Sequence, residues 1–266
     1  MTDEATINSN GYWDSRFAKD WDVCQGPAQS RFFSRVALQN LPRWLLDQTR
    51  RQSLTICDWG CAQGDGTDVW ASYVAARQLT GVDFSSVAVE QARFRYPAIR
   101  FVCEDWLTQS DHVGPTFDLV FSSNTLEHFH EPYEVLDILS RRAQKGLILT
   151  LPYRELERFD EHLYTFLPAN IPLVLPNGFP LVWARVVDCR SLAGTLWQGD
   201  QIVLVYVDSR WAHGLALTLQ DSLFTQNDGD AELARLKMLV AKGDAQVASL
   251  SEHVQQLEQL RRDRDS

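Results

Sequence analysis

The chain has 266 residues, of which 45% are hydrophobic, and its formal net charge at pH 7 is −10. This is enough for one sizeable domain with a hydrophobic core and further segments. The negative charge argues against polyanionic partners, so no nucleic acid partner is expected. No apolar run approaches the roughly 18 residues that span a bilayer, and the polar residues 1–13 lack the apolar core of a signal peptide.

The cysteine content favours a reducing compartment. The five cysteines are odd in number and contain no C-x-x-C pair, so we expect free thiols that mostly fill the core of a cytoplasmic protein. They are Cys24, Cys57, Cys61, Cys103 and Cys189.

The first regular elements expected in the chain are helical. Residues 11–48 have a helical pattern in two pieces. From residue 54 short apolar runs alternate with helical segments, and such nearly continuous runs are typical of parallel strands buried on both faces. The expected strands are 54–59, 78–84, 99–106, 117–123 and 145–152, and the helices among them are 67–77, 85–95 and 131–143.

This alternation ends after residue 151. Residues 152–180 contain five prolines within the stretch "PYRELERFDEHLYTFLPANIPLVLPNGFP" and predict an irregular cap. Strands are then expected at 181–189 and 201–209, and their connection is too short for a crossover helix, so they should be antiparallel. The predicted fold class is therefore α/β, a doubly wound, Rossmann-like, seven-stranded sheet with a terminal antiparallel hairpin.

The C-terminal part has a different pattern. We expect a catalytic domain over 1–210, a linker over 211–230 and a coiled-coil helix over 231–266. Apolar residues at 3-4 spacing predict a homo-oligomer, a dimer or trimer, held by the a and d positions of the heptads. Gly243 is the one of these positions that is unfavourable in a helix. The seam positions are Leu233, Leu236, Val240, Gly243, Val247, Leu250, Val254 and Leu257.

A glycine-containing loop, "DWGCAQGDG", follows the first strand, where doubly wound sheets bind ligands. Ala62 and Asp65 occupy the second and third glycine positions of a dinucleotide fingerprint. The carboxylate of Asp65 would repel a pyrophosphate, and the loop has no P-loop lysine. A phosphate is therefore disfavoured. Ala62 is tolerable if the backbone there does not need a positive φ.

Acidic residues end the first three strands. Asp58 ends the first, Asp83 the second, and Glu104 with Asp105 the third. Such residues can bind ribose hydroxyls and an exocyclic amine, and Trp106 could stack on a base. The ligand indicated is an adenosine with a cationic tail, which S-adenosylmethionine fits. Asp58 could instead cap a turn, and Trp106 could equally be a core residue.

Together with "FDLVFSSNTLEHFHEP" at 117–132, these motifs resemble the class I S-adenosylmethionine-dependent methyltransferases over about residues 54–151. The resemblance implies contacts of Asp83 with the ribose, Phe84 with the adenine, Asp105 with its amine, and Ser123 or Asn124 with the methionine part. The stretch "YWDSRF" resembles an N-terminal helix of sugar-modifying members, which implies that Trp13 and Arg16 or Arg31 close over the cofactor. The expected cofactor-binding set is Trp13, Arg16, Arg31, Asp58, Gly60, Gly64, Asp83, Phe84, Asp105, Trp106, Ser123 and Asn124.

Three residues are candidates for catalysis. His162, in "DEHLYTF", could take a proton from a sugar hydroxyl, or could simply hydrogen-bond within the cap. Glu127 and His128 are expected to line the acceptor pocket. The stretch "EHFHE" could also bind a metal, but His128 and His130 would point apart on a helix, and no second ligand pair is evident. No metal is therefore expected.

The expected reaction is O-methylation of a sugar. A methyltransferase domain followed by heptads resembles enzymes that cap bacterial O-antigen chains, which implies lipopolysaccharide biosynthesis, a location peripheral to the inner membrane and a glycosyltransferase partner. A phosphate acceptor would instead need basic residues such as Arg154 and Arg158. A small-metabolite methyltransferase and an inactive scaffold on an oligomerising stalk are the remaining alternatives.

Overall fold

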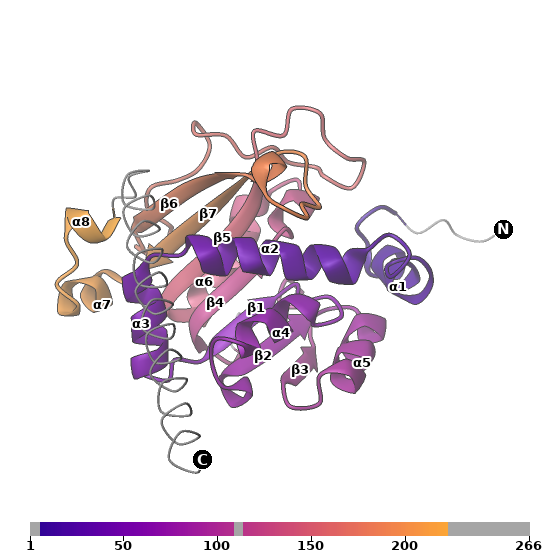
Figure 1. Ribbon diagram of the computed structural model, residues 1–266, viewed down its shortest axis with the longest axis horizontal. Coiled ribbons are helices and arrows are strands. Elements are labelled where there is room, and N and C mark those ends of the chain that lie inside the picture. Colours follow the sequence, from indigo (N-terminus) through magenta and orange to yellow (C-terminus); the bar gives the residue numbers. More distant parts are fainter. Residues whose placement is uncertain (1–5, 109–113, 223–266) are drawn as a thin grey trace, which may run out of the picture. The chain divides into compact units, whose positions relative to one another are not determined.

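The computed structural model describes residues 6–108 and 114–222 (Figure 1). Seven strands form one sheet in the order β3-β2-β1-β4-β5-β7-β6. The first five strands are parallel, and β7 is antiparallel to both β5 and β6. The predicted sheet with its terminal antiparallel hairpin is confirmed. The strands are β1 Ile56–Trp59, β2 Leu79–Asp83, β3 Arg100–Cys103, β4 Phe117–Ser123, β5 Ala143–Tyr153, β6 Leu181–Asp188 and β7 Asp200–Val207.

Helices cover both faces of this sheet (Figure 1). Apolar residues of α2 to α5 pack on one face, and those of α6 and the β5–β6 connection pack on the other. This matches the continuous apolar runs, because neighbouring strand residues such as Ile56 and Cys57 enter opposite core layers. The helices are α1 Asn10–Lys19, α2 Gly26–Asn40, α3 Arg43–Arg51, α4 Asp65–Ala71, α5 Ser86–Arg95, α6 Pro132–Arg142, α7 Ser209–Gly214 and α8 Leu219–Ser222, with 3₁₀ turns η1 Ala76–Gln78, η2 Leu126–His128 and η3 Cys189–Ser191.

The N-terminal region has three helices rather than the predicted two. The apolar pattern that continues through Leu41 to Leu45 is divided between α2 and α3. Leu41 is extended, with ψ of 150°, and Pro42 precedes the first residue of α3. A proline disfavours the helical conformation of the residue before it, so the chain bends there although the apolar spacing continues.

The third strand is shorter than predicted. It ends at Cys103, and the Asp105 carboxylate accepts a hydrogen bond from the backbone N–H of Leu107 at 2.9 Å. This side-chain-to-backbone bond forms a local turn, which turns the chain away from the sheet. Asp105 therefore lies in the connection after the strand.

The first domain continues beyond residue 210, where a linker was predicted. The compact unit extends to Ser222 and includes α7 and α8. Trp211 packs against the core, with its ring centroid 5.9 Å from that of Trp44. A single tryptophan in a polar stretch carries no periodicity, which is why the pattern did not reveal this helix. The predicted coiled coil at 231–266 lies outside the described residues.

Among the described helices, none combines the length and apolar character that crossing a bilayer requires.

Candidate active site

The strand order reverses beside β1, whose neighbours are β2 and β4. In doubly wound sheets ligands bind at the carboxyl ends of the strands at such a reversal. The loop from Gly60 to Gly64 lies at this position, between β1 and α4. The backbone N–H groups of Gly60 and Cys61 donate to the Val82 carbonyl at 2.9 and 3.2 Å, which fixes the loop against β2.

Two glycines give this loop its shape. Gly60 has a φ of +74° and Gly64 a φ of +82°, in the left-handed region that favours glycine. A side chain at Gly60 would lie 2.6 Å from the Thr125 hydroxyl oxygen, and one at Gly64 would lie 2.7 Å from the Phe101 ring. Gly60 lines the cavities described below, whereas Gly64 lines neither.

Ala62 also has a positive φ, of +48°, so the condition under which an alanine was judged tolerable is not met. Its backbone N–H donates to the Asp83 carboxylate at 2.9 Å, which holds it in this conformation. The methyl group is therefore a source of backbone strain.

We expect Ala62→Gly to raise the free energy of unfolding by up to about 1 kcal/mol. The left-handed conformation costs an alanine about 1–2 kcal/mol, and the greater freedom of unfolded glycine offsets about 0.5–1 kcal/mol of this. Urea denaturation measures the effect. Ala18→Gly, at an exposed position of α1, is the control and should lower stability by about 1 kcal/mol. Equal losses in both variants would contradict the strain at Ala62.

Two adjoining cavities open at the carboxyl edge of the sheet. The larger, of about 600 Å³, and the smaller, of about 100 Å³, share six lining residues. The small cavity lies beside the ends of β1 to β4, and the large cavity extends under α1, α2 and the β5–β6 and β6–β7 connections. The shared residues are Trp13, Trp21, Gly60, Ala62, Asn124 and His128.

Carboxyl groups and aromatic rings line the small cavity. Asp83, Glu104 and Asp105 all lie on its wall, and the described lining residues include no lysine or arginine. Asp83 is buried, and its two oxygens accept hydrogen bonds from the backbone N–H groups of Ala62 and Ser85, both at 2.9 Å. Burial raises the pKa of Asp83 to about 6, partly opposed by these two bonds.

Trp106 is completely buried at the wall of the small cavity. Its indole N–H donates to Glu104 at 3.1 Å, its ring stacks on Phe117, and the Arg142 guanidinium lies 4.5 Å from its centroid. These contacts favour the core interpretation over a base-stacking surface. Phe84, also predicted from the resemblance, lies on the same wall and is half-buried.

Asp58 lines the large cavity and is 5% exposed. Its carboxylate accepts a hydrogen bond from the Thr67 hydroxyl at 2.5 Å. Burial raises the pKa of Asp58 to about 7, with a further contribution from the charge of Asp83. Asp58 thus braces α4 through Thr67 and also faces the cavity.

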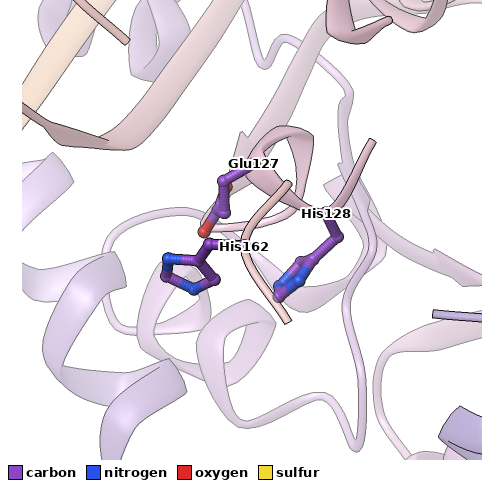
Figure 2. A group of neighbouring side chains, drawn as sticks. All are labelled: Glu127, His128 and His162. Atoms are coloured by element: carbon purple, nitrogen blue, oxygen red, sulfur yellow. The ribbon is translucent and has the colours of Figure 1, made fainter. Parts of the chain in front are cut away.

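The three catalytic candidates come together at the wall of the large cavity. Glu127 and His128 belong to η2, and His162 comes from the long β5–β6 connection. One ligand-type atom of each lies within 4.8 Å of those of the other two. Figure 2 shows the Glu127 carboxylate next to the His162 ring, with His128 on the adjacent side.

Each of these side chains has an unusual environment. Glu127 is completely buried, and neither carboxylate oxygen has a hydrogen-bond partner among the described residues. Burial raises the pKa of Glu127 to about 7, and burial lowers the pKa of His128 to about 4. Burial also lowers the pKa of His162, but the hydrogen bond that His162 donates to Glu155 and the nearby carboxylate charges outweigh this and raise it.

The remaining predicted residues are placed as follows. Ser123 and Trp13 line the large cavity, and the Trp13 ring lies 5.2 Å from that of His128. Arg16 lines it too, with its guanidinium 3.4 Å from Asp20 and 3.6 Å from Glu161.

Arg31 lines neither cavity, which differs from the expectation that it closes over a cofactor. Its guanidinium pairs with Asp68 at 2.8 Å and also donates a hydrogen bond to the Tyr96 hydroxyl at 2.9 Å. These contacts hold it away from both cavities. Arg154 and Arg158, the candidates for a phosphate acceptor, also lie outside both linings. The Arg158 guanidinium instead donates to the Leu163 carbonyl.

Sequence patterns missed several residues of the large cavity. Tyr12 donates to Glu161, and Phe159 and Trp197 place their rings 5.6 and 6.1 Å from that of His162. The Glu155 carboxylate accepts a hydrogen bond from Nδ1 of His162. Apart from Tyr12 of α1, they lie in irregular segments where periodicity offers no signal; only the density of aromatic and acidic residues around "ERFDEH" marks the region.

Comparison with known proteins agrees with this geometry. Residues 56–146 match the model of a family described as "Methyltransferase domain". A magnesium protoporphyrin IX methyltransferase from Synechocystis PCC 6803, solved with bound S-adenosylhomocysteine, is similar at a TM-score of 0.54 and 19% identity, over 75% of this chain and 98% of that one. The described domain has the class I methyltransferase fold.

The curated relatives match this methyltransferase fold over shorter segments. A trans-aconitate 2-methyltransferase from Paracidovorax citrulli (strain AAC00-1) is 31% identical over 72 residues, 27% of this chain and 28% of the relative. The enzyme of the same name from Delftia acidovorans (strain DSM 14801 / SPH-1) is 27% identical over 121 residues, 44% and 43% of the two chains. The chain thus spans less than half the length of these relatives.

Proposed function

We propose that this protein is an S-adenosylmethionine-dependent O-methyltransferase that acts on an uncharged, hydroxyl-bearing acceptor, a sugar in the first place. The observation that carries the proposal is the pair of cavities at the switch point of a methyltransferase fold. One is lined by carboxylates suited to an adenosine, and the other ends in a Glu-His-His cluster.

The residues present fit S-adenosylmethionine. Asp83 can accept hydrogen bonds from ribose hydroxyls with its remaining lone pairs, and Asp105 can accept one from the adenine amine. Arg16, the one lysine or arginine among the described residues of the large cavity, is placed to attract the methionine carboxylate. Asp58 and Glu127 add negative charge that suits a sulfonium. The similar Synechocystis enzyme has been solved with S-adenosylmethionine and with S-adenosylhomocysteine bound.

When bound, S-adenosylmethionine supplies a methyl group on a positively charged sulfur. Transfer of this methyl group to an acceptor hydroxyl would release the hydroxyl proton, which the protein would take up. We assign proton removal to the cluster of Glu127, His128 and His162. The rest of the site aligns the acceptor and excludes water, which accounts for much of the acceleration in such a transfer.

The charge of the large cavity argues for a neutral acceptor. Four acidic residues line it against Arg16, whose guanidinium already pairs with Asp20 and Glu161. A tricarboxylate such as trans-aconitate would be repelled there. Phe159, which is 63% exposed, and Trp197 instead offer rings for the apolar face of a sugar. The acidic residues are Asp58, Glu127, Asp160 and Glu161.

Transfer of a radiolabelled methyl group tests the acceptor. We expect labelling of neutral cell-envelope glycans or of a neutral metabolite, and no labelling of trans-aconitate. Labelling of trans-aconitate alone would overturn the acceptor class. An absence of calorimetric binding of S-adenosylmethionine would overturn the proposed function and favour an inactive scaffold.

We expect Asp83→Asn to weaken S-adenosylmethionine binding by about 5- to 150-fold, because leaving a buried polar group unpaired costs about 1–3 kcal/mol. Calorimetry measures the affinity. Thermal unfolding must accompany it, since the new amide nitrogen would face a backbone N–H of Ala62 or Ser85. Asp22→Asn, at a side chain 62% exposed, is the matched control. Unchanged affinity in folded Asp83→Asn would remove Asp83 from the cofactor site.

A further inference from the structure

The cluster of Glu127, His128 and His162 has features that proton transfer alone does not require. A buried carboxylate without a hydrogen-bond partner is costly, and in native proteins it calls for a specific explanation such as a bound ion. Both oxygens of Glu127 are in this state among the described residues. They face the imidazole rings of two histidines (Figure 2).

The two histidines are oriented in the same way. The Nδ1 atom of His128 lies 2.9 Å from the Glu161 carbonyl oxygen, which can only accept, so this nitrogen must donate. The Nδ1 atom of His162 lies 2.7 Å from a carboxylate oxygen of Glu155, which acts in the same manner. In each ring this leaves Nε2 as the nitrogen available to a ligand. Metal-binding histidines are held in this way, by a carbonyl or carboxylate on the far nitrogen.

We propose that Glu127, His128 and His162 form a binding site for a divalent first-row transition metal ion, with two imidazole nitrogens and one carboxylate as ligands. This donor set suits zinc, manganese, iron or cobalt better than magnesium or calcium, which prefer oxygen ligands. Ligands about 2.0–2.1 Å from a tetrahedral zinc lie about 3.3 Å apart. The candidate ligand atoms now lie within 4.8 Å of one another, and small side-chain movements would bring them to that distance.

Three protein ligands leave at least one coordination position open, and all three residues line the large cavity. A hydroxyl oxygen of the acceptor would occupy that position, and the ion would lower its pKa and orient it toward the cofactor. This role rests on the proposed function, whereas the metal site rests on the side chains alone. The sequence did not predict a metal, because its third ligand lies 34 residues beyond His128 in an irregular segment.

Titration of the untagged, chelator-treated protein with Co²⁺ and Zn²⁺ tests the site. We expect one ion per chain, a visible Co²⁺ absorption band that Zn²⁺ abolishes, and a higher melting temperature with Zn²⁺. Glu127→Gln should weaken Zn²⁺ binding at least 100-fold. Glu155→Gln, which removes the carboxylate behind His162, should weaken it about 10- to 100-fold. His130→Ala, at an exposed histidine of the same stretch, should bind like the wild type.

Absence of a stoichiometric ion in the wild type, or unchanged affinity in Glu127→Gln, would overturn the proposal. The shift of the wild-type melting temperature does not depend on whether Glu127→Gln folds. Binding of S-adenosylmethionine, measured with and without chelator, separates the two proposals. Cofactor binding and methyl transfer that persist in chelator would refute the catalytic role of the ion and leave the proposed function intact. Metal binding without cofactor binding would refute the proposed function and leave the metal site intact.

Discussion

Replacing His162 by alanine is expected to lower kcat by about 10²- to 10⁴-fold, the range of a general acid–base contribution, with little change in affinity for S-adenosylmethionine. His162 lines the large cavity and not the small one, so its loss should affect the acceptor hydroxyl and spare the adenosine. Its position is set by the 2.7 Å bond to Glu155. Single-turnover kinetics with labelled cofactor, together with calorimetry, measure the two effects separately.

His130→Ala is the control for this experiment, because His130 is exposed and lines neither cavity. It should retain wild-type turnover. Wild-type turnover in His162→Ala would show that the imidazole only supports the β5–β6 connection. A loss of cofactor affinity as large as the loss of kcat would also contradict a role confined to the acceptor.

The second large effect concerns stability. We expect Asp58→Asn to be more stable than the wild type at pH 8 by as much as about 4 kcal/mol, and this difference to vanish near pH 4. Asp58 is buried, and its pKa rises from the ordinary 3.8 to about 7 in the folded domain. Asparagine keeps an acceptor for the Thr67 hydroxyl but carries no charge to desolvate.

The sign follows from proton binding. Between pH 4 and 7 the folded wild type binds a proton at Asp58 that the unfolded chain has released, so its free energy of unfolding falls as pH rises through this window. Asp58→Asn lacks this dependence. Urea denaturation of both proteins without cofactor, at several pH values from 4 to 8, measures the difference. A constant difference across that range would show that the carboxyl group ionises normally.

The sheet was predictable because each buried strand repeats the same apolar signal within a few residues. The meeting of acidic residues at one edge was predictable for a related reason, since Asp58 and Asp83 lie at the ends of strands and Asp105 follows one, and parallel strands bring their carboxyl ends to one edge. The Asp105 turn and the break before Pro42 alter element ends without changing this order.

The acceptor side could be predicted only in part. Glu127 and His128 follow β4 directly, but the place of His162 depends on how an irregular connection folds back onto the sheet. The Leu163 and Tyr164 N–H groups donate to the Glu127 carbonyl, a contact that no local pattern encodes. Arg31 was assigned to the cofactor because arginines suit carboxylates, yet Asp68 of α4 and the hydroxyl of Tyr96, which follows α5, bind it instead.

The large cavity is assembled from two kinds of segment. Gly60, Asn124 and His128 lie within residues 56–146, the part shared with the methyltransferase family, whereas Tyr12 and His162 lie outside it. The β5–β6 and β6–β7 connections line the large cavity and not the small one, whereas residues of α1 line both. We therefore expect substitutions in these two connections to change acceptor choice while the donor half is preserved, and exchanging them between such domains is the experiment that this division suggests.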